Sequence, residues 1–258
     1  MTAAAAPALP QAYLIILGAL AGLIVGSFVG ALVQRWPRGE SIARGRSSCD
    51  ACGTLLRPYE LIPLLSFVAQ RGRCRTCGAS IPRAHVAAEA AAAIVGVTAF
   101  AATPPLLAIA GLAFGCTLIA LALLDASHLW LPDRLTLPFG ALGIAAAFAG
   151  LGPAPRDSLL GAVAGFAALT LIGWAYRRVR GRTGLGGGDP KLLGAIGAWL
   201  GWQLLPFVLL LASLTGLAAI AIRAARGAPV AATDKLPLGT LMALAAWPVW
   251  LVANGTRR

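Results

Sequence analysis

The stretch Gly-Gly-Gly-Asp-Pro-Lys at residues 186–191 places an acid after three glycines and directly before an apolar run, residues 192–211. A second acid, Asp125, ends another apolar run that begins at Leu106. An ionisable residue at the edge of an apolar span is costly in free energy, so it marks a candidate functional site. We therefore predict that the fold brings Asp125 and Asp189 together at a membrane surface.

The residues around the two acids are candidates for substrate binding or support. Glycine permits unusual backbone conformations and lets another chain, such as an extended peptide substrate, approach closely, which points to Gly186 and Gly188. Lys191 has two open roles, either biasing the ionisation of the nearby acid or facing lipid headgroups. Glu89 is an acid within an apolar run, one helical turn after His85, and is a further polar-site candidate.

The composition is that of a membrane protein. Of the 258 residues, 59% are hydrophobic and only 12% are charged, and apolar runs near 20 residues recur along the chain. The net charge of +12 raises the possibility that the protein binds a nucleic acid. The basic residues flank apolar spans, however, so we expect them to face membrane lipids and expect no nucleic-acid partner.

The apolar runs predict an all-α polytopic membrane protein with about eight transmembrane helices. The first run is expected to remain as a span, because the residues before it lack the basic start of a signal peptide. Several runs are short and rich in alanine and glycine, which favours close helix packing. The predicted spans are residues 12–33, 85–103, 105–124, 135–151, 157–176, 190–204, 205–222 and 236–254.

In an eight-span arrangement, loops rich in basic residues alternate with loops that have few of them. All but three of the 21 lysines and arginines fall on one side, the exceptions being Arg156, Arg257 and Arg258. The positive-inside rule places the basic side in the cytoplasm, together with both acids and the large loop after the first span. Both termini are then predicted to be periplasmic.

Four of the five cysteines form two pairs, Cys49-x-x-Cys52 and Cys74-x-x-Cys77. This spacing is close to that of a zinc ribbon, in which two tight turns offer four thiolates to one tetrahedral ion. Two disulfides are the alternative, which a reducing cytoplasm disfavours. Because four cysteines leave no open coordination position, we predict a structural zinc ion rather than a catalytic one.

Two carboxylates that share a site can divide the work of peptide hydrolysis. One ionises and activates a water molecule, while the other stays protonated and donates to the carbonyl, as in aspartic proteases.

Asp133 follows a proline and is placed to cap the helix that begins near Arg134. Paired acids also build ion pathways in transporters and proton channels, and the cysteine loop alone is compatible with an interaction module.

Six motifs in order resemble those of the type IV prepilin peptidases, the membrane-embedded leader peptidases of type IV pilus and type II secretion systems. Any one of them is weak, whereas the ordered set covers nearly the whole chain. They are residues 22–28, the paired cysteines with residues 62–66 and 71–74, Asp125 with residues 131–133, residues 186–192, residues 197–201 and residues 236–239.

The resemblance implies an intramembrane aspartic endopeptidase in which Asp125 and Asp189 are catalytic. The implied substrates are prepilins or pseudopilins, whose short basic leader is cut at the cytoplasmic face of the bacterial inner membrane. Many family members also methylate the new N-terminus with S-adenosylmethionine as the cofactor. Residues 29–32 and 83–85 depart from the family pattern, and both lie in the part associated with methylation.

The spans and the cysteines together predict three parts. Residues 1–34 form the first transmembrane helix, residues 35–84 a cytoplasmic zinc-binding domain, and residues 85–258 a seven-helix peptidase membrane domain. A loop of about fifty residues is small for a self-sufficient hydrophobic core, and a bound metal is a usual remedy.

Overall fold

The computed structural model describes residues 10–42, 46–182, 184–227 and 236–255. The predicted positions of the two termini, and of Arg257 and Arg258, lie outside these ranges. Within them the chain is helical, and its β-pairing consists of isolated bridges. The long helices are α1 (Gln11–Arg35), α3 (Arg83–Ala102), α4 (Pro105–His128), α5 (Asp133–Phe148), α6 (Pro155–Arg180), α7 (Asp189–Leu200), α8 (Leu205–Ala225) and α9 (Leu238–Gly255).

These helices coincide with the eight predicted apolar segments, which confirms the all-α class. In the described ranges, six segments containing α1, α3, α4, α6, α8 and α9 are long and apolar enough to cross a membrane. Helices α5 and α7 have 16 and 12 residues, which corresponds to about 24 and 18 Å of length. Both are shorter than the hydrocarbon core of a bilayer, roughly 30 Å.

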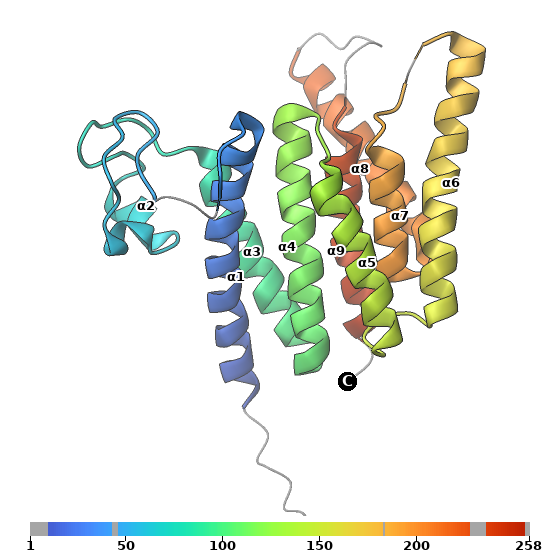
Figure 1. The fold of residues 1–258 in the computed structure, drawn as a ribbon, viewed down its shortest axis with the longest axis horizontal. Coiled ribbons are helices and arrows are strands. Elements are labelled where there is room, and N and C mark those ends of the chain that lie inside the picture. The colour runs from blue at the N-terminus through green and yellow to red at the C-terminus, as the bar shows by residue number, and fades with distance from the viewer. Residues whose placement is uncertain (1–9, 43–45, 183, 228–235, 256–258) are drawn as a thin grey trace, which may run out of the picture.

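The helices run alternately up and down, so that the loops before α3, α5 and α7 lie at the same end of the bundle (Figure 1). Helices α5 and α7 begin below the top of this end. Residues 36–42 and 46–82, here called the cysteine domain, lie beside α1. They carry the short helices η1 (Trp36–Arg38), η2 (Pro58–Leu61) and α2 (Leu65–Ala69). The start of α6, with Arg156, is at the opposite end.

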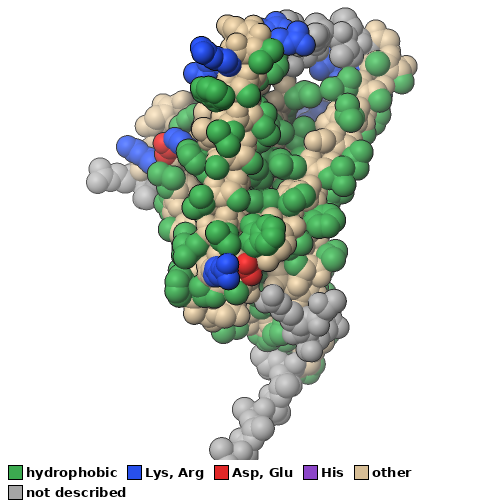
Figure 2. Space-filling model, turned by 90° about the vertical axis from the view of Figure 1, so that its right-hand side faces the viewer, with side chains coloured by type: hydrophobic (Ala, Val, Ile, Leu, Met, Phe, Trp, Pro, Cys, Tyr) green, Lys and Arg blue, Asp and Glu red, His purple; other side chains and the backbone are tan. Residues whose placement is uncertain are grey.

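The outer surface is apolar over a broad area. Figure 2 shows the face that includes α6, with hydrophobic side chains along its length and lysine and arginine side chains gathered near one end. The exposed side chains of α6 include Val163, Phe166, Trp174 and Val179, and arginines occupy its last turn. A lipid bilayer is the environment that covers such a surface. With six candidate spans, this is a multi-pass membrane protein.

Glycines bring neighbouring helices into backbone contact. A Cβ added to Gly18 of α1 would lie 2.6 Å from the carbonyl oxygen of Gly96 of α3. A Cβ added to Gly165 of α6 would lie 2.6 Å from the carbonyl oxygen of Leu193 of α7. Small residues at such crossings let membrane helices pack closely. The first crossing closes a hairpin of α1 and α3, and the second holds α7 against α6.

An aromatic cluster packs against the other side of α7. The Phe114 ring of α4 lies 5.6 Å from the Phe139 ring of α5 and 5.3 Å from Trp199 of α7, measured between centroids. The indole N–H of Trp199 donates to the Phe139 carbonyl at 2.8 Å. Rings at these distances attract beyond their buried area. These contacts fix α7 inside the bundle and so fix the position of Asp189, its first residue.

Candidate active site and cysteine cluster

Asp125 lies in the last turn of α4 and is only 5% exposed. Its Oδ2 accepts a hydrogen bond from the backbone N–H of Thr240 at 2.8 Å. The Thr240 hydroxyl lies 3.2 Å from the same oxygen and shares its one proton with the Ala122 carbonyl at 2.9 Å. Thr240 stands in the first turn of α9, where backbone N–H groups favour negative charge. Gly239 makes room for this contact, because a Cβ there would lie 2.9 Å from Asp125 Oδ2. The sequence analysis identified neither role on α9.

Asp189 is the first residue of α7 and is 8% exposed. Its Oδ2 accepts a hydrogen bond from the N–H of Gly186 at 3.0 Å. A Cβ at Gly186 would lie 3.1 Å from that oxygen, and a Cβ at Gly188 would lie 2.7 Å from Leu131, whereas one at Gly187 would meet nothing within 4 Å. None of the three glycines has a positive φ. Close approach, rather than unusual backbone conformation, explains glycine at positions 186 and 188.

Leu131 links the surroundings of the two acids. Its side chain lies against Gly239, which contacts Asp125, and against Gly188, which precedes Asp189. Leu131 therefore brings the surroundings of the two carboxyl groups next to each other. The structure thus holds two buried acids in one site, formed by the end of α4 and the beginnings of α7 and α9.

Lys191 pairs with Asp133, a partner that had not been predicted from the sequence. Its Nζ lies 2.8 and 2.7 Å from the two carboxylate oxygens. The predicted capping role of Asp133 is wrong, because α5 begins at Asp133 itself, Pro132 occupies the N-cap position, and no side-chain cap bond forms. The pair joins the first turns of α5 and α7. Because both side chains are partly exposed, it contributes about 0–1 kcal/mol.

Glu89 is buried in α3 and ties the cysteine domain to the membrane helices. One carboxylate oxygen lies 3.2 Å from the Nε2 of His85, one turn earlier, and the other accepts the N–H of Leu64 at 2.8 Å. Leu64 has a φ of +58°, which is rare for a residue other than glycine. Glu89 therefore holds a strained turn of the cysteine domain against α3.

The four predicted cysteines form one cluster that could hold a metal ion. All four sulfurs lie within 4.8 Å of one another, and those of Cys49 and Cys77 are 3.8 Å apart. A tetrahedral ion with bonds of about 2.3 Å to sulfur separates its ligands by about 3.8 Å. Hydrogen bonds with Thr54 lower the pKa of the Cys52 thiol to about 6, whereas the neighbouring cysteine sulfurs raise the pKa of the Cys77 thiol to about 11.

Each cysteine pair forms the same tight turn. The N–H of Gly53 donates to the carbonyl of Cys49 at 2.8 Å, and the N–H of Gly78 donates to the carbonyl of Cys74 at 2.9 Å. The two glycines have φ values of +70° and +71°, a region where glycine is favoured. The repeated geometry directs both pairs towards one point. The cluster therefore fits one shared ion better than two separate disulfides, and its cysteines are free thiols.

Two family models match the chain. Residues 20–103 match the bacterial peptidase A24 N-terminal domain, and residues 112–221 match the type IV leader peptidase family. The first match contains the cysteine cluster, and the second contains Asp125 and Asp189. No solved structure matches the chain significantly.

Several named relatives match most of the chain. It is 37% identical to the prepilin leader peptidase/N-methyltransferase of Pseudomonas aeruginosa, over 88% of this chain and 87% of the relative. Proteins of the same name from Dickeya chrysanthemi and Burkholderia pseudomallei are 39% and 34% identical, over 81% and 93% of this chain and 82% and 86% of the relatives. The chain therefore belongs to the type IV leader peptidase family and is a peptidase.

Proposed function

We propose that the protein is an intramembrane aspartic endopeptidase that removes the basic leader from prepilins or pseudopilins. Its relatives carry the name prepilin leader peptidase/N-methyltransferase. The observation that carries the mechanism is the pair of buried acids, Asp125 and Asp189. Each accepts one backbone N–H, from Thr240 in the first turn of α9 and from Gly186 in the loop before α7. Incubating the purified protein with synthetic prepilins, with and without S-adenosylmethionine, tests the proposal directly.

A difference in hydrogen bonding supports different roles for the two acids. Asp125 accepts from two groups of Thr240, whereas Asp189 accepts from Gly186 alone. Asp125 is therefore the carboxylate that takes a proton from water as the water oxygen attacks the scissile carbonyl carbon. Asp189 donates its proton to the carbonyl oxygen. When the tetrahedral diol collapses, the C–N bond breaks, the proton held by Asp125 passes to the leaving amine nitrogen, and one hydroxyl proton returns to Asp189.

Thr240→Val should lower the rate of cleavage about two- to tenfold. The variant keeps the backbone N–H but loses a hydroxyl whose one proton is shared between Asp125 and the Ala122 carbonyl, so the loss is that of an ordinary hydrogen bond, about 0.5–1.5 kcal/mol. The loss should appear in kcat with KM unchanged, because Thr240 positions Asp125 and does not bind the substrate. Thr240→Ser retains the hydroxyl and should cleave at nearly the normal rate. Steady-state kinetics showing equal rates for the two variants would disprove this positioning role.

We propose that the protein lies in the inner membrane of a bacterium. The end of the bundle that carries the two acids then faces the cytoplasm. The basic last turn of α6 and the arginines of the cysteine domain lie at this end, in agreement with the positive-inside rule. Both chain termini would then be periplasmic. The cytoplasmic site is also where a basic leader is held back from translocation.

Accessibility labelling tests this orientation. A cysteine at Ala154, in the loop before α6, should react with a membrane-impermeant maleimide added to cells with a permeable outer membrane. A cysteine at Arg182, in the loop after α6, should react only after the inner membrane is opened. Both positions are exposed. The reverse pattern would invert the proposed topology.

We propose that the cysteine cluster binds one structural zinc ion. The donor set is four thiolates, which zinc prefers and which leaves no position for substrate or water. The cysteine domain has few buried side chains of its own in the described ranges. Such a small domain gains much of its folding free energy from a bound ion.

We propose that N-methylation, the second activity in the relatives' name, uses a cavity of about 230 Å³ between the cysteine domain, α1 and α3. Ser27, His85 and Glu89 line it, and S-adenosylmethionine would supply the methyl group there. The two departures from the family pattern meet beside this cavity. A Cβ on Gly30 would collide with the imidazole of His85, so glycine at position 30 accommodates histidine at position 85.

A further inference from the structure

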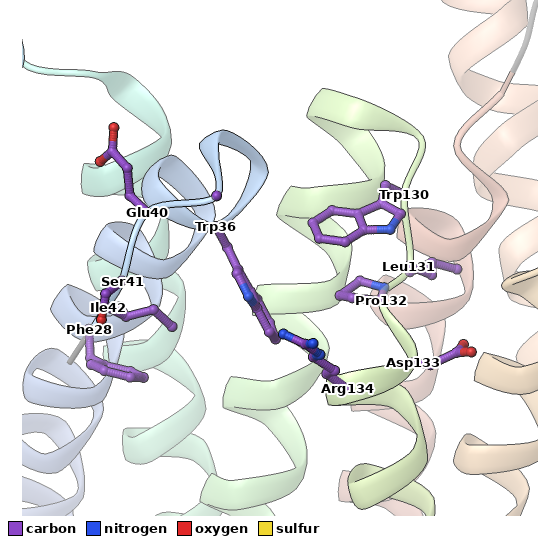
Figure 3. A pocket seen from close by; sticks show the side chains of 11 residues that line it. Phe28, Trp36, Glu40, Ser41, Ile42, Trp130, Leu131, Pro132, Asp133 and Arg134 are labelled. Carbon is purple, nitrogen blue, oxygen red and sulfur yellow. The ribbon is translucent and has the colours of Figure 1, made fainter. Parts of the chain in front are cut away.

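A groove of about 850 Å³ lies beside the acid site, on the other side of residues 130–134 (Figure 3). Its walls come from the end of α1, the segment after η1, and the loop between α4 and α5. Most of its lining is apolar or aromatic, including Phe28, Trp36, Ile42 and Trp130. None of the roles proposed above uses it.

Residues 130–134 separate the groove from the two acids. In Figure 3 the side chains of Trp130 and Pro132 point to the groove, whereas Leu131 and Asp133 point the other way. Leu131 packs beside both acids, and Asp133 pairs with Lys191. One extended segment is thus a wall of both the groove and the acid site. A peptide lying in the groove is therefore separated from the two acids only by residues 130–134.

The two ends of the groove differ in polarity. Phe28 is 54% exposed and follows Ile24, 68% exposed, on the outer face of α1. This end opens on the apolar surface that lipid covers. In Figure 3, Ser41 and Ile42 lie close to Phe28, whereas Glu40 lies farther from it, toward the end of the bundle that carries the acids. The groove therefore connects the bilayer with the aqueous end of the bundle past the acid site.

The charge of the groove favours the apolar segment of a leader-bearing substrate over its basic leader. The Arg134 side chain lies beside Trp36 in the middle of the groove (Figure 3). Asp133 is neutralised by Lys191 at 2.7 Å. The middle is therefore apolar and net positive, which repels a basic leader and favours an apolar segment. The acid in the lining that could attract the leader is Glu40, at the outer end.

We propose that this groove binds the apolar segment of the peptide substrate next to the scissile bond, with its side chains against Trp36 and Trp130. The inference rests on the proposed peptidase function and specifies its substrate site. The two indole rings lie 6.1 Å apart between centroids. In the described ranges the N–H groups of Trp130 and Leu131 donate to no backbone carbonyl. An extended substrate can therefore pair with this segment.

Kinetics on a synthetic prepilin peptide test the groove. Trp36→Ala and Trp130→Ala should each raise KM about tenfold and leave kcat nearly unchanged, as expected for loss of one aromatic contact. Trp36→Phe and Trp130→Phe keep a ring and should restore most of the affinity. Trp174→Ala is the matched control, because Trp174 is an exposed tryptophan on α6, and its KM should be unchanged.

Photo-crosslinking tests the same site without removing its contacts. p-Benzoylphenylalanine in place of Trp130, in an Asp189→Asn protein that leaves the peptide uncut, should crosslink to the apolar segment. The same group in place of Trp174 should not. Normal cleavage with unchanged KM in both alanine variants and no crosslink at position 130 would overturn the groove assignment alone. A crosslink at position 130 without cleavage by the unmodified protein would support the groove and overturn the peptidase mechanism.

Discussion

Asp125→Asn and Asp189→Asn should each reduce leader cleavage about 10³-fold or more, because each removes one proton-transfer group of the acid pair. The asparagine side chain has nearly the same size. Its carbonyl oxygen can still accept the hydrogen bond from Thr240 or Gly186. Both variants should therefore insert and fold normally. The measurement is conversion of prepilin to its shorter mature form by equal amounts of purified protein.

Asp157→Asn is the matched control. Asp157 lies at the start of α6, at the other end of the bundle, where its carboxylate accepts a hydrogen bond from the Trp202 indole at 3.1 Å. The same chemical change at this position should leave cleavage intact. Complete processing by either Asp125→Asn or Asp189→Asn would rule out the aspartic mechanism.

Loss of the cysteine cluster should remove the metal and impair methylation more than cleavage. The purified protein should contain about one zinc ion per chain, as four thiolates predict. A Cys49→Ser, Cys52→Ser double variant should lose that ion and become sensitive to protease between α1 and α3. Methylation should be lost with it, because the proposed cavity is lined by the cysteine domain. Cleavage should persist at a reduced level, since the acids and their donors lie on α4, α7 and α9.

Cys116→Ala controls for the loss of a thiol as such. Cys116 is buried in α4, away from the cluster, and its variant should keep the zinc ion. Metal analysis and alkylation of the native protein decide the first part of the prediction. Absence of zinc, with all four cluster thiols freely alkylated, would refute it. Methylation of a pre-cut pilin by the double variant, with cleavage abolished, would reverse the assignment of the two activities.

Local patterns in the sequence predicted the helices and the cysteine cluster. Apolar runs locate membrane helices, because a chain in lipid must satisfy its backbone polar groups within the segment. The Cys-x-x-Cys spacing locates the cluster, because each turn fixes two sulfurs independently of the rest of the fold. The prediction was less accurate for α7, expected over 190–204. It ends at Leu200, because Gly201 adopts a φ of +81° and the short helix η3 (Trp202–Leu204) follows.

The partners of the acids could not be predicted from local patterns. Thr240 lies 115 residues from Asp125, and Lys191 lies 58 residues from Asp133. Such contacts depend on which helices cross and at what depth, which close packing between helices determines. Gly239 was noted only as part of a family motif. A small residue at the start of an apolar helix can indicate a close approach, but it does not identify the approaching group.

The glycine crossing of α1 and α3 has an evolutionary consequence. It closes a hairpin that carries the cysteine domain, and neither the acids nor their hydrogen-bond donors belong to it. The two family models meet between residues 103 and 112, just after this hairpin. Acquisition or loss of the hairpin by gene fusion or deletion would leave the acid pair intact. Because Phe28 and Trp36 line the groove, the same event would change which peptides are selected for cutting.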